Sequence, residues 1–170
     1  MLVPYGIVTV VAAFAWFYAF DPGSGFVNGL PFVDDDKAWF GERWSAMAVI
    51  IAAEVWKTTP FMALLLLAGL TTIDETLYEA AKVDGATWWQ RFTKITLPLM
   101  RPAILVALLF RTLDAFRVFD SIFVMTRGSQ DTESISIVGY NQLISRLNLG
   151  LGSAVSVLIF LVVFAIAAFF

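Results

Sequence analysis

The stretch EAAKVDGATWWQRFTKITLP, residues 79–98, is the part of the sequence that decides the fold. It is polar, and it lies between two long hydrophobic segments, residues 44–70 and 102–125. A helix that crosses the hydrocarbon core of a bilayer needs about 20 mostly apolar residues. Because both segments reach that length, the stretch between them is expected to form a loop on one face of a membrane.

Composition also places the chain in a membrane. Of its 170 residues, 59% are hydrophobic and only 15% are charged, and the mean hydropathy is +0.80. Soluble domains carry about a quarter charged residues. The chain has no cysteine and no histidine, which excludes disulfides and thiolate metal sites and removes the usual general base near neutral pH. A net charge of -3 without clustered basic residues gives no support to nucleic-acid binding.

Four membrane spans are predicted within one transmembrane domain that covers residues 1–170. The fold class is therefore all-α, a polytopic membrane helical bundle. The chain begins and ends within hydrophobic segments, and we interpret it as a fragment of a longer protein. The predicted spans are residues 1–20, 44–70, 102–125 and 151–170, joined by polar segments 21–43, 71–101 and 126–150.

The distribution of Lys and Arg predicts the orientation of the spans. Membrane loops rich in Lys and Arg stay on the cytoplasmic side. The segment 71–101 holds four of these residues, whereas 21–43 and 126–150 hold two each. The segment 71–101 is therefore predicted to be cytoplasmic, and the other two are predicted to be outer loops.

The segment 71–101 is predicted to contain two short helices at an angle. Thr72 and Glu75 have the spacing of a capping box, in which a hydroxyl and an acid three residues later satisfy free amides at a helix start. Gly85 can adopt the left-handed conformation that ends a helix, so it is expected to form the elbow.

The second helix of this segment has its own start and stop signals. Thr87 and Gln90 form another capping-box pattern. Leu97 and Pro98 are expected to end the helix, because the residue before a proline avoids the helical region.

The spacing of this loop resembles the signature of ABC-transporter permeases. In that pattern Glu-Ala-Ala is followed after three residues by Gly, and after nine more by Ile-x-Leu-Pro, as in this chain. Over most of its length the chain is similar to the carbohydrate-uptake branch, importers of the maltose or trehalose type. The resemblance implies that the loop docks on a separate ATPase. The residues expected to couple to the ATPase are Glu79, Ala80, Ala81, Asp84, Gly85, Leu97 and Pro98.

The resemblance also implies partners and a mechanism. A type I ABC importer permease has about six spans, and the four predicted here match the last four. Its expected partners are two copies of an ATPase subunit, a second related permease in a heterodimer, an extracytoplasmic solute-binding protein and membrane lipid. ATP and Mg are expected on the ATPase, and the chain itself is expected to bind no cofactor or metal. The implied function is inward movement of a sugar, such as a disaccharide, by alternating access across the plasma (inner) membrane of a prokaryote.

Charged side chains inside the predicted spans mark a candidate solute path. Ionisable groups are costly inside a bilayer, so they rarely face lipid. The order Arg, Asp, Arg, Asp at intervals of three on the third span predicts a self-neutralising ridge. Aromatic rings nearby are suited to stacking on a sugar, although a static network that holds helices together is the alternative. The candidate path residues are Glu54, Trp56, Lys57, Arg111, Asp114, Phe116, Arg117, Phe119 and Asp120.

The sequence contains no Gly-x-x-x-x-Gly-Lys-Ser/Thr loop, serine elbow or metal-ligand cluster, so a transport subunit is predicted in place of an enzyme. Three alternatives remain open. The first is an importer permease for another solute, such as glycerol phosphate. The second is an ion-coupled secondary transporter with Glu54, Asp114 or Asp120 as its ion site. The third is a membrane scaffold without a solute path.

Overall fold

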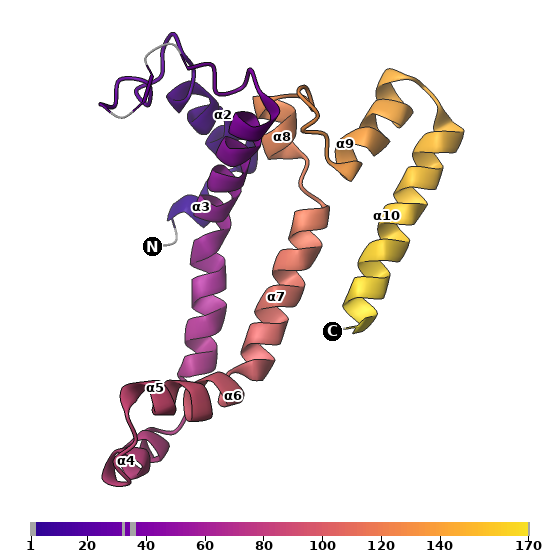
Figure 1. The fold of residues 1–170 in the computed structure, drawn as a ribbon. Helices are drawn as coiled ribbons and strands as arrows, with labels where there is room; N and C mark the ends of the chain where they lie inside the picture. Colours follow the sequence, from indigo (N-terminus) through magenta and orange to yellow (C-terminus); the bar gives the residue numbers. More distant parts are fainter. Residues whose placement is uncertain (1–2, 32, 35–36, 170) are drawn as a thin grey trace.

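The computed structural model describes residues 3–31, 33–34 and 37–169, and the regular structure in these ranges is helical (Figure 1). The all-α class is confirmed. The predicted span ends at residues 1, 2 and 170 lie outside the described residues. In chain order the helices are α1 (Val3–Gly6), α2 (Thr9–Ala19), α3 (Arg43–Leu70), α4 (Glu75–Val83), α5 (Trp88–Arg91), the π-helix η1 (Phe92–Thr96), α6 (Leu97–Leu99), α7 (Arg101–Phe116), α8 (Asp120–Met125), α9 (Ile135–Tyr140), the π-helix η2 (Asn141–Ser145) and α10 (Leu149–Phe169).

Two helices in the described ranges, α3 with 28 residues and α10 with 21, are long and apolar enough to cross a membrane. A third crossing is formed if the segments Trp88–Leu99 and Arg101–Met125, which meet at 65°, count as one bent span. At 1.5 Å per residue, α3 is about 42 Å long and exceeds the hydrocarbon core of about 30 Å. The predicted span 44–70 falls on α3, and the described part of the predicted span 151–170, residues 151–169, falls on α10.

The predicted span 1–20 is not one continuous helix. The first helix, α1, ends at Gly6 and α2 begins at Thr9, so α2 has 11 residues and is too short to cross a bilayer alone. Between them Val8 is extended, with φ -56° and ψ 132°. Lys57 of α3 donates a hydrogen bond to the Thr9 hydroxyl, which fixes the start of α2 against α3.

The predicted span 102–125 is also broken. The helix α7 ends at Phe116, and α8 begins at Asp120. A break leaves carbonyl groups without helical partners, and these need other donors. The hydroxyl of Ser134, the residue before α9, donates to the carbonyl of Val118 at 2.8 Å. The break is therefore supported by a contact with a later part of the chain.

The packed core lies at the end of the molecule where α2, α8 and the start of α3 meet, at the top of Figure 1. Pairs of aromatic rings surround it, such as Phe17 with Phe40 and Phe20 with Trp39, each pair at 5.1 Å between centroids. This core ties α2, α3, α8 and α9 together at one end. Its buried members are Ala13, Val49, Ile50, Ala53, Ile122, Met125 and Ile137.

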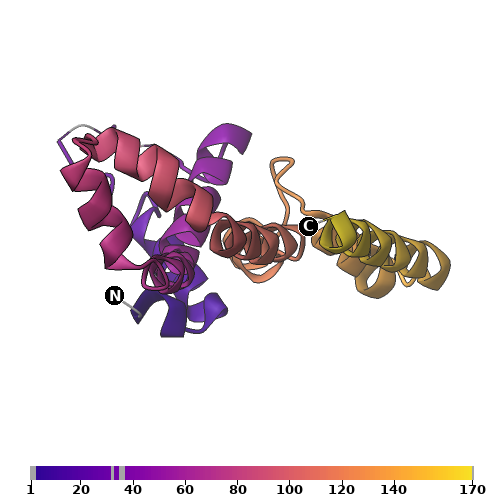
Figure 2. The same ribbon diagram turned by 90° about the horizontal axis from the view of Figure 1, so that it is seen from below.

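From this core α3 and α7 run side by side to the opposite end, where the loop with α4 projects (Figure 1). The two helices approach closely at Gly69 and Ala103, and a Cβ atom at Gly69 would overlap the side chain of Ala103. Seen from below, α10 lies on the side of α7 away from α3 (Figure 2). Two continuous helices, α3 and α7, thus lead from the region of the core to the projecting loop.

Candidate functional site

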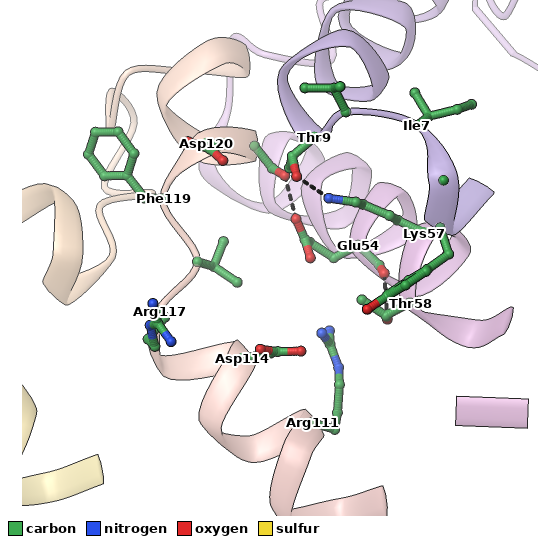
Figure 3. A pocket seen from close by; sticks show the side chains of 15 residues that line it. Ile7, Thr9, Glu54, Lys57, Thr58, Arg111, Asp114, Arg117, Phe119 and Asp120 are labelled. Carbon is green, nitrogen blue, oxygen red and sulfur yellow. Dashed lines mark hydrogen bonds between the residues drawn. The ribbon is translucent and has the colours of Figure 1, made fainter. Parts of the chain in front are cut away.

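A polar cavity of about 650 Å³ is lined by both helix breaks (Figure 3). Its walls come from the α1–α2 connection, the middle of α3, the last turns of α7 and the residues that lead into α8. Seven of the nine predicted path residues line it, and they carry three cations and three carboxylates. These seven are Glu54, Lys57, Arg111, Asp114, Arg117, Phe119 and Asp120.

Two of the charges bind hydroxyl groups at the helix breaks. Lys57 Nζ donates to Thr9 Oγ1, and Ser121 Oγ donates to Glu54 Oε1 (Figure 3). Both charged residues belong to the middle of α3. One helix therefore holds the start of α2 and the start of α8 against the cavity.

The predicted self-neutralising ridge is wrong. In the described part of the chain, no ion pair joins Arg111 to Asp114 or Arg117 to Asp120, and Arg111 Nη1 is buried without a hydrogen-bond partner. The later charges do not continue the ridge, because α7 ends at Phe116 and α8 begins only at Asp120. Arg111 and Asp114 both point into the cavity (Figure 3) and offer it an unmatched donor and an acceptor.

Two of the predicted path residues lie away from the cavity lining. Trp56 packs against Trp16, with 6.1 Å between ring centroids. Phe116 is the last residue of α7 and is 37% exposed. The solute-binding role of the residues that do line the cavity stays a prediction.

The N-terminal wall of the cavity was missed by sequence reasoning. Tyr5, Gly6 and Thr9 line it, and Tyr5 also stacks on Phe61 with 5.1 Å between centroids and 10° between planes. The available signal was a glycine and a threonine within an otherwise apolar run. Ser121, a serine directly after Asp120, was missed as well.

The second candidate site is the projecting loop, whose first helix, α4, is capped by Asp74. The Asp74 carboxylate accepts a hydrogen bond from the Thr76 backbone N–H at 2.9 Å, which together with the Thr76 side chain lowers the pKa of Asp74 below its ordinary value of 3.8. The predicted capping box of Thr72 and Glu75 is wrong. The Thr72 hydroxyl instead donates a hydrogen bond to the carbonyl of Gly69 at 2.7 Å and so caps the C-terminal end of α3.

The elbow and the start of the second helix are confirmed. Gly85 has a φ of +76°, in the left-handed region. Thr87 and Gln90 form the predicted capping box: the Gln90 N–H donates to Thr87 Oγ1 at 3.3 Å, and the Thr87 N–H donates to Gln90 Oε1 at 2.8 Å. The hydroxyls of Tyr78 and Thr96 are 2.8 Å apart and join α4 to η1 across the bend.

The predicted stop at Leu97 and Pro98 is wrong, because both residues belong to the helical segment α6. In an α-helix the ring of Pro98 would meet the carbonyl of Lys94. The preceding residues form a π-helix, in which the Leu97 N–H donates to the carbonyl of Phe92. This wider turn accommodates the proline without ending the helix.

The helix α4, all of whose residues are described, has no buried residue. Glu79 and Ala80 are exposed, Ala81 is half-buried, and Asp84 and Gly85 follow the helix end. Leu97 and Pro98 lie apart from them in α6, which leads into α7. A docking role for these residues stays a prediction.

Sequence reasoning missed an apolar strip on α4. Leu77, Ala80 and Val83 recur every three residues, and Val83 is 87% and Leu77 44% exposed. A spacing of three places residues on neighbouring positions of a helix surface, and this signal was present in the sequence. An exposed apolar strip on a projecting helix is suited to contact with another protein.

Comparison with known proteins agrees with this arrangement. The family described as "Binding-protein-dependent transport system inner membrane component" matches residues 1–170. The trehalose transport system permease protein SugA of Mycobacterium tuberculosis (strain H37Rv) is 56% identical over 171 residues, which cover 100% of this chain and 55% of that protein. The trehalose/maltose transport system permease protein MalF of Thermococcus litoralis is 44% identical over 167 residues, which cover 96% of this chain and 56% of that protein.

A solved structure shows the same fold. It is a bacterial ABC transporter involved in the import of the acidic polysaccharide alginate, with a TM-score of 0.88 and 28% sequence identity. The match covers 99% of this chain and 60% of the other chain. The chain thus spans a little over half the length of the relatives it matches. It belongs to the family of binding-protein-dependent transport system inner membrane components, and its resemblance to carbohydrate-uptake ABC permeases is confirmed.

Proposed function

We propose that this chain is part of the membrane-spanning permease subunit of an ATP-driven, binding-protein-dependent sugar importer. The observation that carries the proposal is a polar cavity joined by two continuous helices to an exposed, projecting helix. The cavity supplies a place for a solute, and α4 supplies a surface on which another protein can act. Family membership supports this division of roles.

The cavity chemistry favours an uncharged, polyhydroxylated solute. Its charged side chains balance, three against three, so the lining has no net charge that would select an ion. Donors such as Arg111 and acceptors such as Asp114 match the hydroxyl groups of a sugar. The cavity volume of about 650 Å³ lies in the usual range for small-molecule sites. Two similar proteins are named for trehalose transport, and we infer a disaccharide.

The contacts of α4 provide a route for mechanical coupling. ATP and Mg bind to the partner ATPase, and its closure moves α4. The Tyr78–Thr96 bond passes the displacement to η1, and from there α6 leads directly into α7. Since α3 and α7 carry Lys57 and Arg111 on opposite walls of the cavity, their rocking switches the cavity from one side of the membrane to the other.

The assembly implied by this function has several components. The ATPase is present in two copies, and a second related permease completes the pathway. A solute-binding protein delivers the sugar to the outer loops, residues 21–43 and 126–150. The protein is a multi-pass component of the prokaryotic plasma (inner) membrane, with residues 71–101 in the cytoplasm.

Reconstitution of the complete permease with its partner permease, binding protein and ATPase tests the proposal. Uptake of labelled trehalose into vesicles is expected to require ATP and the ATPase. Val83→Asp is expected to abolish uptake, because it places a charge on the exposed apolar strip, whereas the matched Val83→Ala keeps it. Uptake that persists without ATP would favour the ion-coupled alternative, and uptake of glycerol phosphate in place of sugar would favour the other-solute alternative.

A further inference from the structure

A second cavity, of about 330 Å³, lies in the inside corner of the bend between α4 and the segment Trp88–Leu99. Tyr78 and Lys82 of α4 form one wall, and Trp88 and Arg91 of α5 face them, with η1 completing the lining. The Tyr78–Thr96 bond closes the corner at one end. This cavity is separate from the solute cavity and shares no lining residue with it.

The lining of this second cavity is cationic. It includes Lys82 and Arg91, and none of the described residues that line it is acidic. Within the described part of the chain, neither side chain has a hydrogen-bond or ion-pair partner. Two unpaired cations in one corner attract a group with a negative charge.

The helical segment that carries one wall has the composition of a membrane-surface helix. It meets the span Arg101–Met125 at 65°, so its axis is steeply inclined to that of the spanning helix. Its aromatic rings are stacked on one another but exposed: Trp88 is 67% and Trp89 62% exposed, and Trp88 and Phe92 stack at 5.7 Å. Tryptophan gathers at the membrane–water interface, and a helix with aromatic and basic residues lies in that interface.

We propose that this corner binds the head group of an anionic phospholipid. The phosphodiester lies between Lys82 and Arg91, and Trp88 and Trp89 anchor the site at the level of the lipid head groups. Basic pockets at the cytoplasmic ends of spanning helices are suited to such head groups. The bound lipid fills the bend and holds α4 at a fixed angle to α5. The inference rests on the proposed function only in placing residues 71–101 at the cytoplasmic face.

Lipid binding to the complete, purified transporter tests the proposal directly. The probe is phosphatidylglycerol, and binding is measured by native mass spectrometry in the absence of ATP and solute. Lys82→Gln with Arg91→Gln is expected to weaken binding about thirtyfold. Each cation removed near the membrane surface lowers the affinity about fivefold, and the two effects multiply. Lys94→Gln with Arg101→Gln is the matched control, because it removes the same charge from the same segment at residues outside the cavity lining. The control is expected to retain binding.

Three results would overturn the proposal. Unchanged binding in the Lys82/Arg91 variant would show that the corner holds no lipid. An equal loss of binding in the control would show that lipid responds to the overall charge of residues 71–101 and not to this corner. Crosslinking of Lys82→Cys to the ATPase subunit, with no phosphatidylglycerol retained, would assign the corner to that subunit. Failure of the wild-type transporter to take up sugar would count against the proposed function alone, since lipid binding is measured without transport.

Discussion

At the scale of single residues, two charged groups of the polar cavity are held by hydroxyl groups and not by ion pairs. Lys57 and Glu54 lie one turn apart on α3, yet each binds a hydroxyl on a different neighbouring helix. Thr9 and Ser121 are therefore structural partners of charged groups. Removing a partner from a charged group is costly when the site is shielded from water, because the charge then lacks compensation.

Replacing Ser121 by Ala is expected to destabilise the transporter. The variant loses the donor to Glu54, and the expected cost is about 1–3 kcal/mol. The measurement is the melting temperature of the purified complete transporter. Ser145→Ala is the matched control, because the Ser145 hydroxyl is exposed and has only a 3.5 Å contact with Asn141. An unchanged melting temperature for the Ser121 variant would show that this bond does not stabilise α8.

The charges on α7 give a second prediction. Because no ion pair joins Arg111 to Asp114, neutralising one of these residues does not remove an ion-pair partner from the other. Arg111→Gln and Asp114→Asn are each expected to reduce sugar uptake, and the double variant is expected to lose at least as much as the worse single variant. A double variant that recovers uptake relative to either single variant would restore the paired-ridge interpretation.

At the scale of elements, the local sequence predicts the long continuous helices but not the breaks between helices. The long helix α3 was predicted as the span 44–70 from a mostly apolar run interrupted by Glu54 and Lys57, and the structure has it at Arg43–Leu70. The end of α7 was not predicted, since the charge spacing of three continues past it. Ser136 and Ser134 donate to the carbonyls of Phe116 and Val118 at 3.4 and 2.8 Å. Such long-range bonds leave no periodic signal in the sequence.

In the projecting loop, short-range sequence patterns predicted the structure more accurately. The Thr87–Gln90 box and the Gly85 elbow depend on residues a few positions apart, and both were found from the sequence. The start of α4 was misassigned by two residues, because Thr72 and Asp74 are both competent caps. The chain uses Thr72 at the end of α3, which leaves Asp74 for α4.

Gly85→Ala tests the elbow. A residue with a Cβ at a φ of +76° costs about 1–2 kcal/mol, so the bend between α4 and α5 is expected to open. ATPase activity coupled to sugar uptake is the measurement, and it is expected to fall. Gly150→Ala in the first turn of α10 is the control, because its φ is not positive and a Cβ there meets only Asn148 Oδ1, at 3.8 Å. Normal coupling in the Gly85 variant would contradict a fixed bend.

The cap of α4 predicts a pH dependence. Because the pKa of Asp74 is lowered in the folded state, its stabilising contribution is present above about pH 3.8 and is lost as pH falls through the lower folded-state pKa. Hydrogen exchange of the α4 amides, corrected for intrinsic rates, measures this. Asp74→Asn keeps an acceptor without a titrating group, so it is expected to keep protection without the acid-dependent loss. Equal loss in wild type and Asp74→Asn would assign the pH dependence to another group.

At the scale of the whole molecule, the two ends are built differently. The buried core gathers α2, α3, α8 and α9 at one end, whereas α4 at the opposite end has no buried residue. The hydrophobic segments predicted a membrane bundle, and the loop spacing predicted the family. The cavity wall from α1 and α2 was not predicted, because Thr9 acquires its role only when Lys57 reaches it from α3.

The central claim is that α4 receives the motion of an ATPase, and site-directed crosslinking tests it most directly. Ala81→Cys in the complete transporter, paired with single cysteines on the ATPase subunit, is expected to give a crosslink whose yield changes when ATP is added. Ser129→Cys, in the predicted outer loop, is the control and is expected to give none. Absence of any Ala81→Cys crosslink to the ATPase, or labelling of that cysteine by an impermeant thiol reagent added outside the cell, would contradict the claim.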